Sequence, residues 1–402
     1  MMEFELWWLL AIPLFFGLGW AAARLEARQA LRAAGRVPDA YFRGLDHLLN
    51  EQPDRAIDAF IDVVRIDPET IELHFALGNL FRRRGESDRA IRVHQSLAGR
   101  TDLDDAQRTR ALYELGQDFL KAGLLDRADE AFVRLGGTPY ESDALRYRLE
   151  IAQMVRDWPL AIALAQKQDG VDPDAAEHHG VVQRIAHFHC EMAAAALASG
   201  EPEGRVRAQR EVDTALTIDP EHPRAWLLRG QAAWAGHDAY GAIDALRQLA
   251  QASPAHMALA ATTWLAAHEA AGRTDDGIAA LEALNERAPS VDLLAAVADA
   301  RVRRDGRAAA ARWVEAQVQR HPSLLGLDRL LALRLADGES LAPERRAEME
   351  LARRLIHAQA KRLSRYGCRH CGFMAHDFYW QCPGCNRWDT YAPKRNEELD
   401  AA

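Results

Sequence analysis

The chain has 402 residues, 49% of them hydrophobic, so it is long enough for an extended array or a large domain with small appendages. Its formal net charge of −9 at pH 7 argues against nucleic acid as the main partner. Only five cysteines occur, and four of them fall in two Cys-x-x-Cys pairs, which indicates a reducing compartment and argues against a disulfide framework.

The N-terminal segment predicts a membrane anchor. Residues 6–23 form an uncharged run that would be about 27 Å long as a helix, just enough to cross a bilayer core. Glu3 and Glu5 precede the run and four arginines follow it, so the positive-inside rule places the bulk of the chain in the cytoplasm. A cleaved signal peptide and a buried helix are the alternatives, and the acidic start disfavours the first. We therefore expect an anchor at 1–23 and a basic juxtamembrane segment at 24–36.

Residues 37–341 repeat with a period near 34, which is typical of the tetratricopeptide repeat, a pair of antiparallel helices. Gly44 and Gly78 are 34 residues apart, and small residues at such positions let paired helices approach closely. The register continues through eight units, with a four-residue insertion near residue 101 before the third. The sequence thus predicts an all-α superhelical solenoid with a long concave surface for binding a peptide or a partner helix.

Two segments shape the expected organisation of this array. Residues 200–204, with the sequence GEPEG, are a candidate flexible turn between two sub-arrays. Residues 342–365 predict one long amphipathic helix that links the array to the C-terminal domain.

The strongest chemical signal lies in residues 366–395, ahead of a short tail at 396–402. The two pairs supply four thiol groups, and their spacing is typical of a tetrahedral site for Zn²⁺ or a single iron: Cys368, Cys371, Cys382 and Cys385. Gly372 and Asn386 follow the two pairs, where a positive φ is expected. Six aromatic residues surround the cysteines, and we expect most of them to form the core of this small domain: Phe373, Phe378, Tyr379, Trp380, Trp388 and Tyr391.

No catalytic residue is predicted, because the chain contains no phosphate-binding loop, nucleophile elbow or zinc-protease motif. The run from His187 to Cys190 contains metal-binding residue types, but neighbouring residues on a helix point in different directions, so we expect ordinary helix packing. His370 and His376 lie between the cysteines, but four thiolates already complete a tetrahedral shell.

An N-terminal anchor, a tetratricopeptide array and a C-terminal rubredoxin-like knuckle, in this order, resemble the lipopolysaccharide assembly protein B family of Gram-negative bacteria. The most specific stretches are 77–97, 185–191, 366–373 and 379–388. The resemblance implies a single-pass inner-membrane adaptor, facing the cytoplasm, that presents the committed deacetylase of lipid A synthesis to a membrane-bound AAA protease. It also implies that the four cysteines bind one metal ion, iron or zinc.

Two other classes of function stay open at this stage. One is a scaffold that gathers lipopolysaccharide synthesis or transport proteins at the membrane without feeding a protease. The other is an electron-transfer protein with a rubredoxin-type iron as its working centre, whose visible absorption would bleach on reduction. Self-association of the chain also stays open, as do the native metal and the groove residues that contact each partner.

Overall fold

The computed structural model describes residues 42–44, 46–47, 50, 52–66, 71–171, 175–336, 342–363 and 365–396. The predicted anchor at 6–23 and the basic segment at 24–36 lie outside these ranges. Among the helices that the structure describes, none combines the length and the apolar character needed to cross a bilayer.

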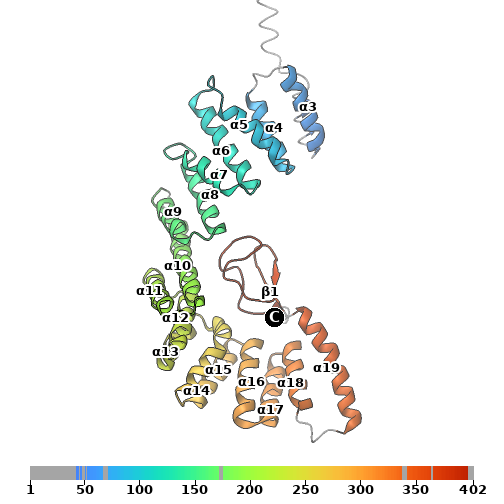
Figure 1. The fold of residues 1–402 in the computed structure, drawn as a ribbon. Coiled ribbons are helices and arrows are strands. Elements are labelled where there is room, and N and C mark those ends of the chain that lie inside the picture. Colours follow the sequence, from blue (N-terminus) through green and yellow to red (C-terminus); the bar gives the residue numbers. More distant parts are fainter. Residues whose placement is uncertain are drawn as a thin grey trace, which may run out of the picture. The chain divides into compact units, whose positions relative to one another are not determined.

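The chain packs as two compact units, residues 1–151 and 152–402, and the division falls inside α8 (Figure 1). The described helices of the first unit follow one another in short antiparallel pairs: α3 (Pro53–Ile66), α4 (Ile71–Arg83), α5 (Ser87–Ala98), α6 (Asp105–Lys121), α7 (Leu125–Val133) and α8 (Glu141–Met154). Each helix packs mainly on its neighbours in the chain, as expected of a repeat array.

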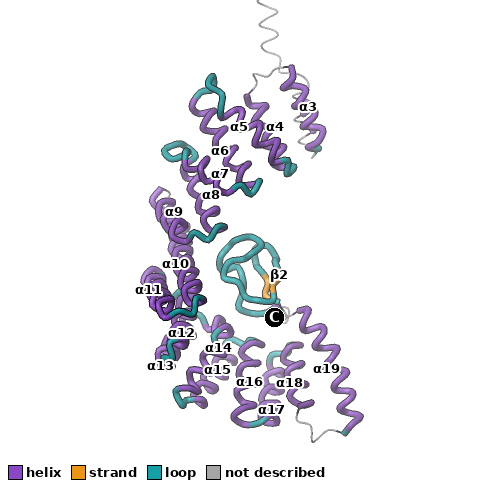
Figure 2. Tube along the Cα trace, in the orientation of Figure 1, coloured by secondary structure: helices purple, strands orange, loops and turns teal. Residues whose placement is uncertain are grey.

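The second unit continues this pattern and ends in the C-terminal knuckle (Figure 2). Its helices are α9 (Trp158–Val171), α10 (Ala175–Ala198), α11 (Pro202–Ile218), α12 (Pro223–Ala235), α13 (Ala239–Ala252), the 3₁₀ helix η1 (Pro254–Leu259), α14 (Ala261–Ala270), α15 (Thr274–Arg287), α16 (Val291–Asp305), α17 (Arg307–Arg320), α18 (Leu324–Ala336) and α19 (Pro343–Leu363).

One recurring close approach confirms the tetratricopeptide architecture. In each of several units, a glycine in the first helix lies against the side chain sixteen residues later in the second helix, so closely that an added Cβ would meet it at 2.4–2.7 Å. The pairs are Gly44 with Phe60, Gly78 with His94, Gly116 with Phe132, and Gly230 with Leu246. A side chain at the glycine position would force the two helices apart, so the glycine spacing in the sequence sets the packing of each pair.

Two expectations from the sequence concern the connections between helices of the array. The four-residue insertion lies in the loop between α5 and α6, which ends in Asp104, the N-cap of α6. The expectation of a boundary at 200–204 is wrong. There α10 and α11 pack directly on each other, and Gly204 is buried in the first turn of α11, where an added Cβ would lie 2.4 Å from the Ala196 carbonyl oxygen. A connection this tight joins the two helices of one pair, and the chain divides instead within α8.

Candidate metal centre and its docking surface

The C-terminal knuckle is a two-stranded hairpin followed by loops. β1 (Tyr366–Gly367) pairs antiparallel with β2 (Met374–Ala375), and an isolated bridge joins Cys368 to Tyr391. Its core is small: buried Tyr366 and Tyr391 pack with two cysteines and the partly buried Phe378. With so little apolar surface, the domain needs a further source of stability.

The two Cys-x-x-Cys segments fold into matching turns. Each first cysteine, Cys368 or Cys382, donates its N–H to the carbonyl five residues later, and its own carbonyl accepts from the N–H four residues later, at 2.8–3.0 Å. The residue after each pair has a positive φ, +74° at Gly372 and +56° at Asn386, which confirms the prediction from the sequence. The turns therefore present their thiols from two similar loops.

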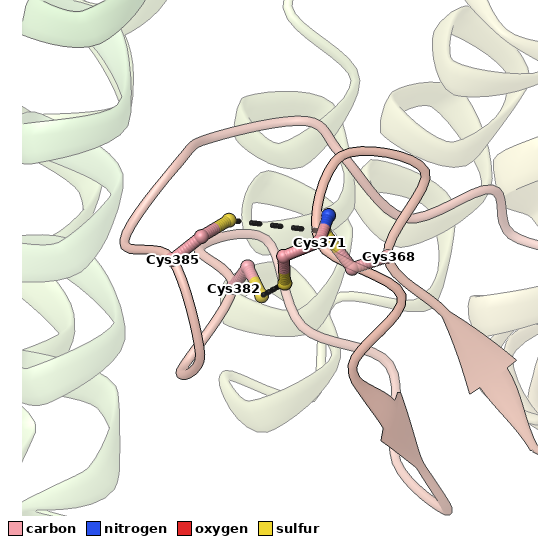
Figure 3. Close-up of side chains that lie close together, drawn as sticks. All are labelled: Cys368, Cys371, Cys382 and Cys385. Atoms are coloured by element: carbon pink, nitrogen blue, oxygen red, sulfur yellow. Dashed lines mark hydrogen bonds between the residues drawn. The ribbon is translucent and has the colours of Figure 1, made fainter. Parts of the chain in front are cut away.

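The four cysteine sulfur atoms converge. Figure 3 shows the side chains pointing toward one another from the two loops, and all four Sγ atoms lie within 4.8 Å of one another. The Sγ atoms of Cys368 and Cys385 are 3.8 Å apart, and those of Cys371 and Cys382 are 3.7 Å apart. A tetrahedron with metal–sulfur bonds of about 2.3 Å has edges of about 3.8 Å, so this arrangement fits one tetrahedral ion.

Backbone N–H groups also point at these sulfurs. Cys371 N–H lies 3.5 Å from the Cys368 sulfur, and Gly384 N–H lies 3.4 Å from the Cys382 sulfur. Such contacts stabilise thiolate over thiol, which is the form that binds a metal.

The cysteine thiols differ in their tendency to ionise. Desolvation raises the pKa of Cys368, but the nearby Thr390 hydroxyl and the backbone N–H groups of Cys371 and His370 outweigh it and lower that pKa to about 5. Desolvation and the neighbouring thiols raise the pKa of Cys385 to about 12. One thiolate thus forms readily and suppresses the ionisation of its neighbours, a repulsion that a bound cation would remove.

The neighbouring histidines do not join this cluster. His370 and His376 are exposed, and among the described residues the cluster of potential ligands around this point contains the four cysteines alone. The expectation that the histidines are not ligands agrees with this placement.

Two tryptophans of the knuckle lie on the helical array. The Trp388 ring stacks on His187 of α10 with centroids 4.6 Å apart, and its indole N–H donates to Gln153 Oε1 at 2.9 Å. Trp380 stacks on His256 of η1 at 4.9 Å and packs against the apolar cluster formed by α12 to α16. We call the surface formed by Gln153, His187, His256 and Asp292 the docking surface.

A hydrogen-bonded histidine–aspartate pair and a cluster of histidines lie beside these rings. His187 Nε2 is 2.6 Å from Asp389 Oδ2, and the His187 ring meets the His222 ring edge-on at 4.3 Å. Burial lowers the pKa of His222 to about 3 and that of His256 to about 4, so both rings are neutral near pH 7. Burial raises the pKa of Asp389, but its hydrogen bond to His187 outweighs this effect and lowers that pKa.

A second polar contact joins the other end of the knuckle to the array. Asp292, in the first turn of α16, accepts from Arg395 at 2.9–3.1 Å and from the Tyr366 hydroxyl at 2.8 Å. Arg395 also lies over the Tyr366 ring, with its Cζ 4.8 Å from the ring centroid. A two-pronged guanidinium–carboxylate pair of this kind is stronger and more directional than a single exposed ion pair.

Sequence reasoning missed the docking surface. Ordinary helix packing was expected for the run from His187 to Cys190, and it holds for Phe188 and Cys190, which are fully buried. His187 instead contacts the knuckle, where its partner Asp389 lies 202 residues later in the chain. The expectation that most of the six aromatics form the knuckle core is wrong. Only Phe378 and Tyr391 do so, since Trp380 and Trp388 face the array and Phe373 and Tyr379 are exposed.

Cys190 is not a nucleophile. Its side chain is fully buried, its sulfur lies 3.8 Å from His222 Nδ1, and burial raises its thiol pKa to about 12. A neutral thiol beside a neutral imidazole, closed off from solvent, cannot attack a substrate.

Comparisons with known proteins agree with this anatomy. The family described as "Rubredoxin metal binding domain" matches residues 366–393. Lipopolysaccharide assembly protein B of Escherichia coli (strain K12) is 32% identical over 392 residues, covering 96% of this chain and 97% of that protein. The protein of the same name from Haemophilus influenzae is 27% identical, covering 97% and 98%.

Two solved structures show some similarity to this chain. PilF of Pseudomonas aeruginosa is 18% identical with a TM-score of 0.31, covering 58% of this chain and 94% of that one. A tetratricopeptide repeat protein from Parabacteroides merdae is 13% identical with a TM-score of 0.25, covering 73% and 97%. At such low TM-scores the fold assignment rests on the helix packing described above.

Proposed function

This chain belongs to the lipopolysaccharide assembly protein B family, and on that basis we propose that it is an inner-membrane adaptor that regulates lipopolysaccharide synthesis. In this proposal it presents the committed deacetylase of lipid A synthesis to a membrane-bound AAA protease. The observation that carries the proposal is the match along 96% of the chain, which spans the helical array and the metal domain together.

The chemistry-bearing side chains that the structure describes are compatible with a binding role. Within the described residues, the thiols in the knuckle form the one group of three or more potential ligand side chains, and Cys190 is buried and neutral. A repeat array offers a large recognition surface, and its function needs no chemistry.

We further propose that Cys368, Cys371, Cys382 and Cys385 hold one iron or zinc ion, and that this ion is structural. The fit of the sulfur–sulfur distances to a tetrahedral site supports this proposal. The metal would supply folding free energy to a domain with a very small core. The knuckle would then present Trp380, Trp388 and Asp389 to the docking surface.

The location of the protein is part of the same proposal. Residues 6–23 would anchor it in the inner membrane, with the array in the cytoplasm. Tethering would raise the local concentration of membrane-bound partners without any new contact. A reporter fused after Ala402 should be active only if it requires the cytoplasm, and activity of a periplasm-dependent reporter would exclude this topology.

The half-life of the deacetylase tests the adaptor function. In cells that lack this protein we expect the deacetylase to persist and lipopolysaccharide to accumulate. Deletion of residues 1–23 should have the same effect at native expression levels. An unchanged half-life in the cells without the protein would favour the scaffold alternative, in which lipopolysaccharide enzymes are gathered at the membrane but not degraded.

A docking variant refines this experiment. Trp388→Ala removes contacts between the knuckle and the array, whereas Tyr379→Ala changes an aromatic residue of the same domain that is 40% exposed. If the docked knuckle is needed, Trp388→Ala lengthens the half-life and Tyr379→Ala does not. Equal half-lives in the two variants would show that docking is dispensable for regulation.

A further inference from the structure

The last helix of the array, α19, has one face that is exposed along its whole length. On its other side it packs mainly on α18, where Arg353 donates to Asp328 at 3.2 Å. Met349, Ile356 and Ala360 lie on that same inner side and are half-buried or buried. Figure 1 shows α19 at the end of the row formed by α16, α17 and α18, so its outer face has no further helix of this row to pack on.

Residues on the outer face recur at alternating steps of four and three positions. At about 3.6 residues per turn, such steps place side chains on one line along a helix, which is the pattern of a coiled-coil seam. Every residue of this line is exposed, and the line is about 27 Å long. We call it the α19 seam, and its residues are Glu344, Glu348, Leu351, Leu355, Ala358 and Arg362.

Two leucines at the centre of the α19 seam indicate a partner. Leu351 is 52% exposed and Leu355 is 66% exposed, and they lie one helical turn apart. The end of a repeat array normally carries a polar outer face, which keeps the array soluble. A single exposed leucine needs no explanation, but adjacent leucines in the middle of a seam favour an apolar contact with another molecule.

The charges of the α19 seam complement those of a second copy of the same helix. Glu344 lies nine positions before residue 353 and Arg362 lies nine positions after it, while the two leucines lie two positions before and after. In an antiparallel pair with its two-fold axis at this position, Glu344 of each copy faces Arg362 of the other. Leu351 of each copy faces Leu355 of the other in the same arrangement.

The charged side chains of the seam are available for such pairs. Among the residues that the structure describes, none forms an ion pair with Glu344, Glu348 or Arg362, whereas Arg346 and Arg353 of the same helix are paired within the chain. Acidic residues near the N-terminal end and basic residues near the C-terminal end also suit the dipole of α19 itself. That effect does not account for the exposed leucines between them.

We propose that α19 is a self-association surface, on which two copies of this chain pair through antiparallel α19 seams. The leucines form the centre of the contact, and the Glu344–Arg362 pairs form its two ends. A membrane of anionic lipids would attract Arg362 but repel the two glutamates, so the mixed charge favours a protein helix as the occupant. A single helix pair buries little surface, so the association is weak and reversible. The inference does not depend on the proposed role in lipopolysaccharide regulation.

Fluorescence resonance energy transfer between full-length chains in detergent micelles tests the α19 seam. One population carries a donor fluorescent protein fused after Ala402, and the other carries an acceptor. Wild-type chains should show energy transfer that falls on dilution. Leu355→Glu should weaken the association about tenfold or more, because it places two carboxylates in the centre of the contact. The transfer that remains in this variant measures association through other parts of the chain.

Charge reversal tests the antiparallel arrangement. Glu344→Arg and Arg362→Glu each place like charges at both ends of the pair, so each should weaken self-association about tenfold. A mixture of these two variants restores opposite charges at both ends and should associate like the wild type. Arg345→Gln is the matched control, since Arg345 is exposed in the same turn but lies to one side of the seam. It should leave the energy transfer unchanged, and circular dichroism should show an intact array in every variant.

Three results would overturn the inference. Energy transfer no greater in the wild type than in Leu355→Glu would show that the seam does not self-associate. Equal transfer in Glu344→Arg, in Arg362→Glu and in their mixture would exclude the antiparallel pair. Binding of anionic lipid vesicles that is lost in Leu355→Glu, without energy transfer between chains, would make the seam a membrane surface. None of these results bears on deacetylase half-life, so failure here is separable from failure of the proposed function.

Discussion

Replacing Trp388 with alanine should release the knuckle from the array without unfolding either part. The Trp388 ring contacts three rings of the array, His187 at 4.6 Å, Phe188 at 5.9 Å and Trp158 at 6.3 Å between centroids. Its N–H also donates to Gln153 at 2.9 Å. All four interactions disappear together in the variant.

The expected loss of docking free energy is about 3 kcal/mol. Aromatic pairs contribute ~0.5–1.5 kcal/mol each beyond area burial, and a hydrogen bond about 1 kcal/mol. The three ring pairs are not independent, so we count them as about 2 kcal/mol in all. A loss of about 3 kcal/mol raises the undocked fraction roughly a hundredfold.

Modification of histidines by diethyl pyrocarbonate, followed by mass spectrometry, reports on this opening. His187 is 1% exposed beneath Trp388, so it reacts only when the knuckle is undocked. We expect its modification rate to rise roughly a hundredfold in Trp388→Ala, in proportion to the open fraction. His94, fully buried in the first unit, should stay protected and serves as an internal control for an intact array.

Tyr379→Ala is the matched control, because this exposed aromatic belongs to the knuckle but not to the contacts with the array. Its His187 should react at the wild-type rate. If His187 reacts equally slowly in wild type, Trp388→Ala and Tyr379→Ala, then the tryptophan contacts do not hold the knuckle and the reasoning is wrong.

Further substitutions test the metal centre, the helix packing and the titrating groups. Cys368→Ser or Cys382→Ser should abolish metal binding and unfold the knuckle, while the array stays helical. Elemental analysis measures the bound metal, and the control variant Cys190→Ala should keep it. Gly78→Ala should destabilise the first unit by about 1–3 kcal/mol in urea unfolding, since the new Cβ would meet His94 at 2.4 Å. Gly99→Ala is the control, because its Cβ would make only ordinary contacts and should leave the unfolding free energy unchanged. Asp118→Asn should lower the free energy of unfolding by about 2–3 kcal/mol, because fully buried Asp118 accepts from Arg82 at 2.8 Å and lies 2.5 Å from His94. Arg82 would keep its contact with Glu114 in this variant. An unchanged unfolding midpoint would refute this expectation. The folded protein lowers the pKa values of His222 and His256 from 6.5 to about 3 and 4, so acid favours the unfolded protein, in which both rings are exposed and can be protonated. The free energy of unfolding should be at its full value above pH 6.5 and fall as the pH drops toward 4. It should fall less steeply in His256→Gln.

Local patterns in the sequence predicted the parts of the molecule that depend on neighbouring residues. The spacing of Gly78 and Gly116 reflects contacts sixteen residues ahead, which lie within a single helix pair. Gly372 and Asn386 have the expected positive φ because the turn after each Cys-x-x-Cys pair needs it. Convergence of the four sulfurs follows from two such turns, so it too was within reach of the sequence.

The contacts that the sequence did not predict join distant residues or hide polar groups. His187 and Asp389 are 202 positions apart, and no local period links a helix of the array to a loop of the knuckle. Asp118 has the appearance of a solvated helix residue, but it is fully buried between Arg82 and His94. The one available signal for docking was an excess of tryptophan in the knuckle, which has more large rings than so small a core can enclose.

The docking contacts make the metal centre relevant to the array. If metal binding supplies most of the folding free energy of the knuckle, loss of the ion removes Trp380, Trp388 and Asp389 from the docking surface together. His187 then loses its hydrogen-bond partner Asp389 and its stacking ring, and Asp292 loses Arg395 and Tyr366. Each of these array residues would become available to another partner. Occupancy of a four-sulfur site would therefore control a binding surface on helices distant in the sequence, although the ligand cluster found among the described residues contains no residue of those helices.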